Sequence, residues 1–129
     1  MVVNLTPHPI VIYAEDRATI LRTIEPDGPT PRVSEVREDL GQVDDIPVQT
    51  TRYGVIEGLP DAVPGTFLIV SSLLLNAAPT YRTDLIAPDT SAGAVRDGGR
   101  ILGTVRFVTR PVEMAPLAPD FEEEEVSLD

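Results

Sequence analysis

Two arginines and two aspartates lie between residues 82 and 96 and could together bind an anion. Arg82 and Arg96 flank a predicted strand, and two guanidinium groups can form a bidentate cradle for a carboxylate or a phosphate. Thr90 would add a hydroxyl group to such a site. Asp84 and Asp89 offer an alternative, because they can pair with these arginines and fix the loops. The pattern leaves both interpretations open, a small anionic ligand or internal Arg–Asp pairing.

The single histidine, His8, is the only side chain of its kind that could act as a general base. Together with Asp84 or Asp89 it would form the base of a hydrolase, provided that the side chains converge in one cleft. His8 also lies between two prolines at the entry of a predicted strand, where it can simply pack or face solvent. His8 and Asn4, which is close to the start of the same strand, could also join the ligand site from the N-terminus.

We expect no metal and no cofactor. The chain has one histidine and no cysteine, which argues against zinc and iron–sulfur sites. The acidic clusters Asp44-Asp45 and 122–125 do not have the spacing of a calcium loop, so we expect a solvated loop and a solvated tail. The glycines match no phosphate-binding loop, and no hydrolase or metalloprotease motif is present.

The charge of the chain argues against nucleic acid as a partner. The net charge is −11, and six of the 21 acidic groups lie in the last ten residues. All ten basic residues are arginine. Such an overall field repels a phosphate backbone. We therefore expect a protein partner or a small anionic ligand.

The distribution of proline and glycine along the chain predicts β structure. Thirteen prolines and nine glycines separate short apolar runs, which is typical of many strands joined by tight turns. We predict one mainly β domain over residues 1–110, a small barrel or rolled sheet of six to eight short strands with one short helix near residues 72–78. Residues 111–129 are rich in proline and then acidic, and they predict a disordered tail. The expected strands are 10–13, 19–24, 32–36, 46–53, 67–70, 84–87 and 101–108, with a loop at 37–45 and a hairpin turn at 97–99.

The predicted core follows from the alternation of apolar residues along these strands. The run 67–70 is the most apolar of the chain and predicts a buried central strand, after which Ser71 or Ser72 caps a helix that Pro79 stops. Open edges of so small a sheet allow a homo-oligomer. The side chains that we expect inside are Ile10, Ile12, Ile20, Val48, Phe67, Ile69, Leu73, Leu85, Ile101, Val105 and Phe107.

Three short blocks of the sequence carry a resemblance. They are residues 4–10, NLTPHPI, residues 58–71 with GLP followed by PGTFLIVS, and residues 82–90 with RTDL followed by PDT. In these blocks the chain resembles a group of short uncharacterised proteins of phages, prophages and actinobacterial genomes. The resemblance spans most of residues 3–108 and implies a phage-linked context and a compact fold. It implies no activity and carries over no catalytic residue.

The first function that we expect is a non-catalytic binding or interaction module, phage-associated, that engages a protein or a small anionic ligand. The alternatives are a structural or assembly component of a phage particle and a hydrolase that uses His8. No stretch approaches the roughly 20 apolar residues that span a bilayer. The first apolar run is interrupted by two prolines and lacks the basic start of a signal peptide. We therefore expect no membrane partner and a cytoplasmic protein, in the host cytoplasm if phage-encoded.

Overall fold

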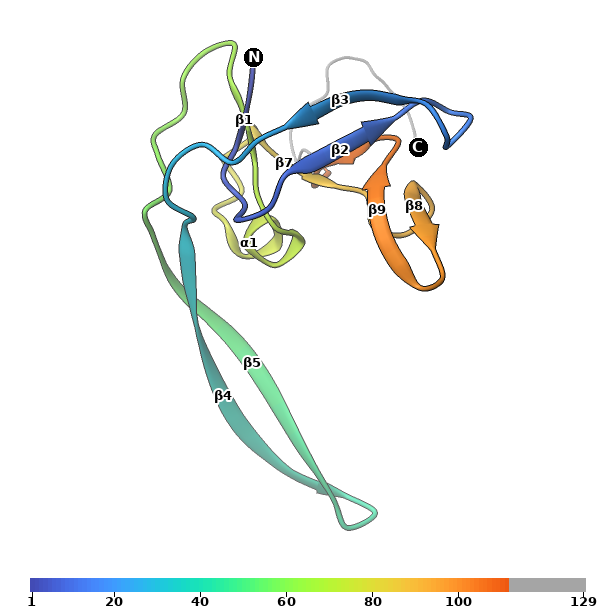
Figure 1. Ribbon diagram of the computed structural model, residues 1–129. Helices are drawn as coiled ribbons and strands as arrows, with labels where there is room; N and C mark the ends of the chain where they lie inside the picture. The colour runs from blue at the N-terminus through green and yellow to red at the C-terminus, as the bar shows by residue number, and fades with distance from the viewer. Residues whose placement is uncertain (112–129) are drawn as a thin grey trace, which may run out of the picture.

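The computed structural model describes residues 1–111, which form a β-rich body and one long hairpin (Figure 1). A mainly β chain with one short helix is confirmed, although ten strands are present rather than six to eight. Apart from Pro111, the predicted tail over residues 111–129 lies outside the described residues. The elements are β1 (Val2–Asn4), β2 (Ile10–Tyr13), β3 (Ile20–Ile24), β4 (Arg32–Val43), β5 (Ile46–Glu57), β6 (Phe67–Ile69), α1 (Ser72–Ala77), β7 (Leu85–Pro88), β8 (Ala94–Asp97), β9 (Arg100–Thr104) and β10 (Phe107–Val108).

The first sheet has the strand order β1-β6-β7-β10 and contains the predicted central strand. Both β1 and β7 pair in parallel with β6, and β10 pairs antiparallel with β7. Because β6 has a neighbour on each side, its backbone ladder is complete, and two of its three side chains lie in the core. Leu68 is 6% exposed and Ile69 is fully buried. The prediction of a buried strand at this point is confirmed.

The helix α1 follows β6 directly and covers the core of the first sheet. The hydroxyl of Ser71 caps it by accepting a hydrogen bond of 3.2 Å from the backbone N–H of Leu74. Pro79 disfavours helical backbone at the residue before it, so the helix is short. Leu74 and Leu75 are buried in the same cluster as Leu85. No helix in the part of the chain that the structure describes is long and apolar enough to cross a membrane.

The second sheet has the strand order β3-β2-β9-β8 and is built from two hairpins. β2 pairs antiparallel with β3, and β8 pairs antiparallel with β9. The β8–β9 turn places Gly98 and Gly99 at φ values of 57° and 92°, a pair of left-handed residues that suits a two-residue hairpin. The hairpin predicted at 97–99 is therefore confirmed. β2 and β9 join the two hairpins through a parallel pairing at Ile12 and Thr104.

The two sheets meet at two junctions, and each junction contains a buried polar side chain. At the first, Asn4 at the end of β1 bridges to Pro26, just after β3. At the second, the chain runs from β9 through Val105 and Arg106 into β10, so one bent segment contributes to both sheets. Asn4 is 0% exposed and Thr104 is 1% exposed. The arrangement is a rolled pair of sheets, and the described residues form no closed barrel.

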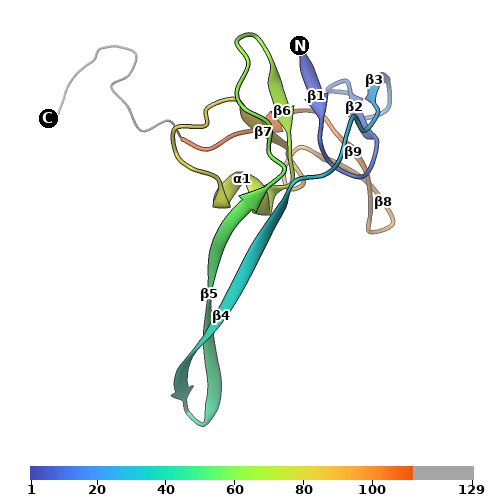
Figure 2. The ribbon, with the colours of Figure 1, turned by 90° about the vertical axis from the view of Figure 1, so that its left-hand side faces the viewer.

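The hairpin of β4 and β5, which we call the arm (residues 32–57), projects away from the body (Figure 2). The two strands pair antiparallel from Arg32 opposite Glu57 to Val43 opposite Ile46. The loop predicted at 37–45 is wrong, because 37–43 lie in β4 and only the next two residues form the turn. Cross-strand pairing orders this polar stretch, and a register shift beside Gly41, at φ 100°, accommodates the extra residue.

Candidate interaction surfaces

Arg82 and Asp84 form a bidentate ion pair inside the body. The Nε and Nη2 atoms of Arg82 each lie 3.0 Å from an oxygen of Asp84, and Nη2 also donates a 2.8 Å hydrogen bond to the carbonyl of Pro60. The side chains are 10% and 13% exposed. The hydrogen bond from Arg82 lowers the pKa of Asp84, and the same bond raises the pKa of Arg82. For Arg82 the structure shows the internal pairing that the sequence left open.

Arg96 has different partners from Arg82. Its Nη2 donates a 3.2 Å hydrogen bond to the carbonyl of Thr90, and the residue is exposed. Asp89 does not pair with Arg96 and instead lies 3.4 Å from the Nε of Arg106. The described contacts therefore do not bring the two predicted cradle arginines onto a common group. Thr90 contributes its backbone oxygen to the Arg96 contact.

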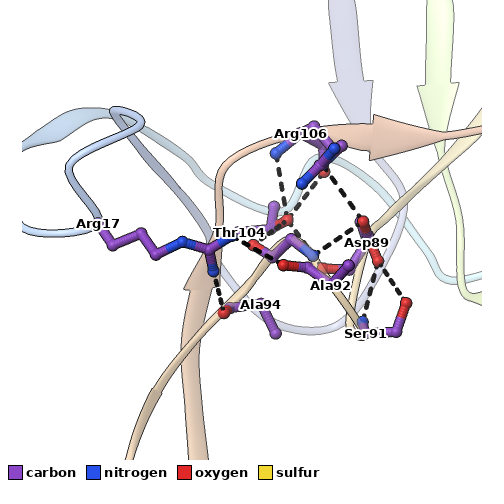
Figure 3. A network of polar contacts seen from close by, with 8 residues as sticks. Arg17, Asp89, Ser91, Ala92, Ala94, Thr104 and Arg106 are labelled. Atoms are coloured by element: carbon purple, nitrogen blue, oxygen red, sulfur yellow. Dashed lines mark hydrogen bonds and ion pairs between the residues drawn. The ribbon is translucent and has the colours of Figure 1, made fainter.

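Asp89 holds the turn between β7 and β8 (Figure 3). One carboxylate oxygen accepts hydrogen bonds of 2.9 Å from the N–H and from the hydroxyl of Ser91, and the other accepts one of 3.0 Å from the N–H of Gly93. The pKa of Asp89 is lowered, first by the backbone hydrogen bond from Ser91. The hydroxyl of Thr104 lies 2.8 Å from the carbonyl of Asp89, and Arg17 donates to carbonyls on the far side of the turn. Asp89, which we expected at a ligand site, uses both of its carboxylate oxygens to hold the second junction.

Sequence reasoning missed three members of this network, Arg17, Thr104 and Arg106. They lie on other segments than the turn itself and reach it only through the fold. Arg17 lies in the β2–β3 connection at a φ of 60° and donates to the carbonyls of Ala94 and Ala92, but both facts are visible only in the structure. The sequence alone gives no signal for Thr104 either.

Asn4 uses all of its hydrogen-bonding capacity within the protein. Its amide nitrogen donates to the carbonyls of His8, at 2.8 Å, and Ile24, at 2.9 Å. Its amide oxygen accepts from the N–H and the hydroxyl of Thr6, at 2.9 and 2.7 Å. A side-chain amide has two donors and accepts two bonds, so none remains for a ligand. The role of Asn4 that these contacts support is structural.

The imidazole of His8 is on the surface, and within the described residues it forms no hydrogen bond to an aspartate. Asp84 and Asp89 are each bonded to the groups named above. The described residues also contain no group of three or more histidine, aspartate and glutamate side chains that could hold a metal ion. The geometry that a His8 hydrolase would need is not assembled in this part of the chain.

Six of the 16 large apolar side chains that are exposed in the described residues lie on the arm. Each strand of 12 residues is about 40 Å long at the usual rise per residue. Nearly every arm residue beyond its base is exposed on both faces of the ribbon. A two-stranded ribbon without a third strand is marginally stable in water. The exposed apolar side chains of the arm are Val36, Leu40, Val43, Ile46, Tyr53 and Val55.

The tip of the arm, residues 43–46, combines two apolar side chains with two carboxylates. Val43 and Ile46 are directly opposite each other across the hairpin and are both 64% exposed. Asp44 and Asp45 form the turn at φ values of 51° and 63°. These are left-handed values that Asn-Gly adopts more easily, and aspartate tolerates them better than most residues. The turn therefore presents two negative charges between two apolar groups.

A small pocket, which we call the β2–β9 pocket, lies in the second sheet where these strands separate. Its volume is about 140 Å³, and its lining has no charged side chain. Ile101 and Leu102 on its wall are 46% and 37% exposed. Thr90, whose carbonyl binds Arg96, also lines it, and Arg100 precedes Ile101. The pocket is lined by Pro9, Ile10, Val11, Pro88, Thr90, Ile101, Leu102, Gly103 and Thr104.

Comparisons of the chain with models of protein families, with curated proteins and with solved structures gave no match.

Proposed function

We propose that the protein is a non-catalytic interaction module that engages a protein partner through its arm. The observation that supports this most directly is the exposure of apolar side chains along a ribbon that the body does not cover. Exposed apolar groups that are contiguous and surrounded by polar ones are typical of protein-binding surfaces. An extended ribbon also offers two strand edges to which a partner strand can add.

A small anionic ligand has less support from the geometry. Arg82 is neutralised by Asp84, and Arg96 and Asp89 have internal partners of their own. The resemblance to phage and prophage proteins adds a context to the proposal, namely a phage-associated module that acts in the host cytoplasm. The assembly of a particle is the specific version of this context that the arm favours, because such an element can bind a neighbouring subunit.

Native mass spectrometry of the protein isolated from the cells that naturally express it tests the proposal. The protein is compared with a variant that has a shortened arm, in which residues 37–51 are replaced by Asn-Gly. Val36 and Arg52 are paired across the ribbon, so a two-residue turn joins them without changing the register. The base of the arm, including the partly buried Ile56 that packs on the core, is retained.

We expect the wild-type protein to retain a protein partner, which can be a further copy, and the shortened variant to lose it. If each protein shows only the mass of its own single chain, with no protein bound to either, the proposal is overturned. A small molecule retained by both and released on denaturation would instead support the ligand-binding alternative.

A further inference from the structure

We propose that the arm binds a second copy of this chain, with the tip of one copy seated in the β2–β9 pocket of the next. This inference rests on the proposed function and specifies its partner. It assigns a role to two features that the fold leaves unexplained, the acidic turn of the arm and the uncovered apolar wall of the second sheet.

The size and polarity of the tip match the pocket. A dry apolar cavity of about 150 Å³ accommodates a group of the size of benzene, and the β2–β9 pocket is close to that volume. Ile46 or Val43, both exposed at the tip, is an aliphatic side chain of a suitable size. Ile101 and Leu102 would lose their exposure to water when one of these side chains fills the pocket.

The charges around the two surfaces are opposite. Asp44 and Asp45 lie between the apolar groups of the tip. The exposed Arg96 bonds the carbonyl of Thr90 on the pocket wall, and the exposed Arg100 precedes the wall residue Ile101 and pairs across the hairpin with Asp97. Seating the tip would place carboxylates near guanidinium groups, which can form charge-assisted hydrogen bonds. The wider surfaces agree, because the arm carries six acidic residues and three arginines, while the strands of the second sheet carry three arginines and one aspartate.

Two larger clefts of the body suit the tip less well. One, of about 400 Å³, is lined by Asp61 and by Arg82, which is already paired with Asp84, and the other, of about 330 Å³, is lined by Asp27 and Asp61. Their carboxylates would repel those of Asp44 and Asp45. The β2–β9 pocket has no acidic side chain in its lining, so charge favours it over these clefts.

The occupant must come from another molecule. Both views show the arm leading away from the body, with its tip far from β2 and β9 (Figures 1 and 2). Tip and pocket are different surfaces, so the contact is head-to-tail, and it leaves one free tip and one free pocket on every dimer. Such contacts produce closed rings or open filaments. The contact area of a tip alone is small, so each single contact is weak and assembly depends on concentration.

The test is the mass in solution of the full chain and of two complementary variants, measured by light scattering over a range of concentrations. The tip variant, Asp44→Asn with Asp45→Gly and Ile46→Thr, removes the carboxylates and one apolar group. Its turn has the residues that this geometry prefers, so the hairpin is retained. The pocket variant, Arg96→Glu with Arg100→Glu, changes only exposed side chains. Arg37→Glu, a charge change halfway along the arm, is the control.

We expect the wild-type chain and the control to associate, less strongly as salt is raised, and each variant to associate at least about tenfold more weakly. A mixture of the two variants should give a one-to-one dimer, because one intact tip and one intact pocket remain between them. Circular dichroism checks folding. If the pocket variant is unfolded, Arg100→Glu alone takes its place.

A wild-type chain that stays monomeric at every concentration would overturn the inference. So would association that persists in either variant, or a mixture that does not associate, since the last result indicates a symmetric contact. A monomeric wild-type chain that still retains a different protein through its arm would leave the proposed function intact and refute only the identity of the partner.

Discussion

The substitution Asn4→Asp tests the junction between β1 and β3, because it replaces only the side-chain NH2 group by an oxygen. In the native protein the amide nitrogen of Asn4 donates to the carbonyls of His8 and Ile24, and the residue is fully buried. A carboxylate has no hydrogen to donate. Both carbonyls then lose a partner and face a negative charge. The carbonyl of Ile24 loses a buried donor, while that of His8 keeps the hydroxyl of Thr6 at 3.0 Å. Each buried group without a partner costs about 1–3 kcal/mol and the new charge is itself buried, so we expect the free energy of unfolding to fall by about 2–4 kcal/mol at pH 7.

The loss should depend on pH in a defined direction. Burial and the facing carbonyls raise the pKa of the new carboxyl at position 4 above its unfolded value of about 3.9. Its protonated form can donate one of the two lost bonds. The destabilisation is therefore smallest below the unfolded pKa and grows as the pH rises through the folded pKa. Wild-type protein lacks this titration at position 4.

Urea denaturation followed by circular dichroism measures the effect from about pH 3.5 to about pH 8, a range that includes the unfolded pKa and the raised folded pKa of the new carboxyl. The matched control is Asn76→Asp, the same substitution at an exposed position of α1, which should change stability by less than about 1 kcal/mol. A position-4 variant that behaves like this control at pH 7, or whose loss does not depend on pH, would refute the account of the junction.

Three further predictions concern the body and use the same assay. Arg82→Met should lower the free energy of unfolding by about 2–4 kcal/mol, whereas Arg52→Met, which breaks an exposed ion pair, should change it by less than about 1 kcal/mol. Because the pKa of Asp84 is lowered in the fold, its ionised form stabilises the protein above the unfolded pKa. This stabilisation is lost as the pH falls through the folded pKa, and Arg82→Met should make the loss of stability at low pH smaller. Thr104→Val keeps the shape but removes a hydroxyl that lies within hydrogen-bond distance of three carbonyls at the second junction and donates its single hydrogen to one of them. About 1–3 kcal/mol should be lost, and an unchanged midpoint would contradict that role. Gly103→Ala should cost about 2–4 kcal/mol, because a Cβ there would overlap a backbone carbonyl of β2, and a stable variant would show that the strands can separate.

The sequence predicts the local hairpins of the body well, because their information is local. The turn at 97–99 contains the two glycines that a tight hairpin needs, and the flanking runs are apolar. The run 10–13 and the next strand are joined by a short polar connection, and they pair as predicted. Helix α1 follows from Ser71 and Pro79. In each case residues within a few positions determine the geometry.

The predicted core was less accurate, because alternation assumes a strand with one face in water. Of the expected residues Ile69 and Leu85 are buried, but Phe67 is 45% exposed and Ile20 is 56% exposed. β6 is an interior strand, and Leu68 and the following Val70 are buried in one cluster with residues of α1. Ile69 is buried as well, so three consecutive residues are inside and the alternation does not hold. Ile20 lies on β3, the edge strand of the second sheet. Which strand becomes an edge depends on pairing across the whole chain.

The candidate site shows the same division between local and distant information. Arg82 and Asp84 are two residues apart, and their pairing was one of the two alternatives that the sequence left open. Asp89 was also expected to pair with an arginine. Its partner is Arg106, which the fold brings across from the segment between β9 and β10 rather than from the neighbouring hairpin.

The arm could not be predicted from alternation because neither of its faces packs on a core. Strand propensity largely reflects the burial of one face against neighbours. Residues 37–45 contain five charged side chains and one glycine, and their sequence is that of a loop. The turn also lacks the Asn-Gly pair that usually marks a hairpin, since Asp44 and Asp45 occupy its left-handed positions. A hairpin selected for its own stability would contain better turn residues and fewer exposed apolar groups. The proposed contact of the tip with another molecule would explain this composition, which the stability of the hairpin alone does not.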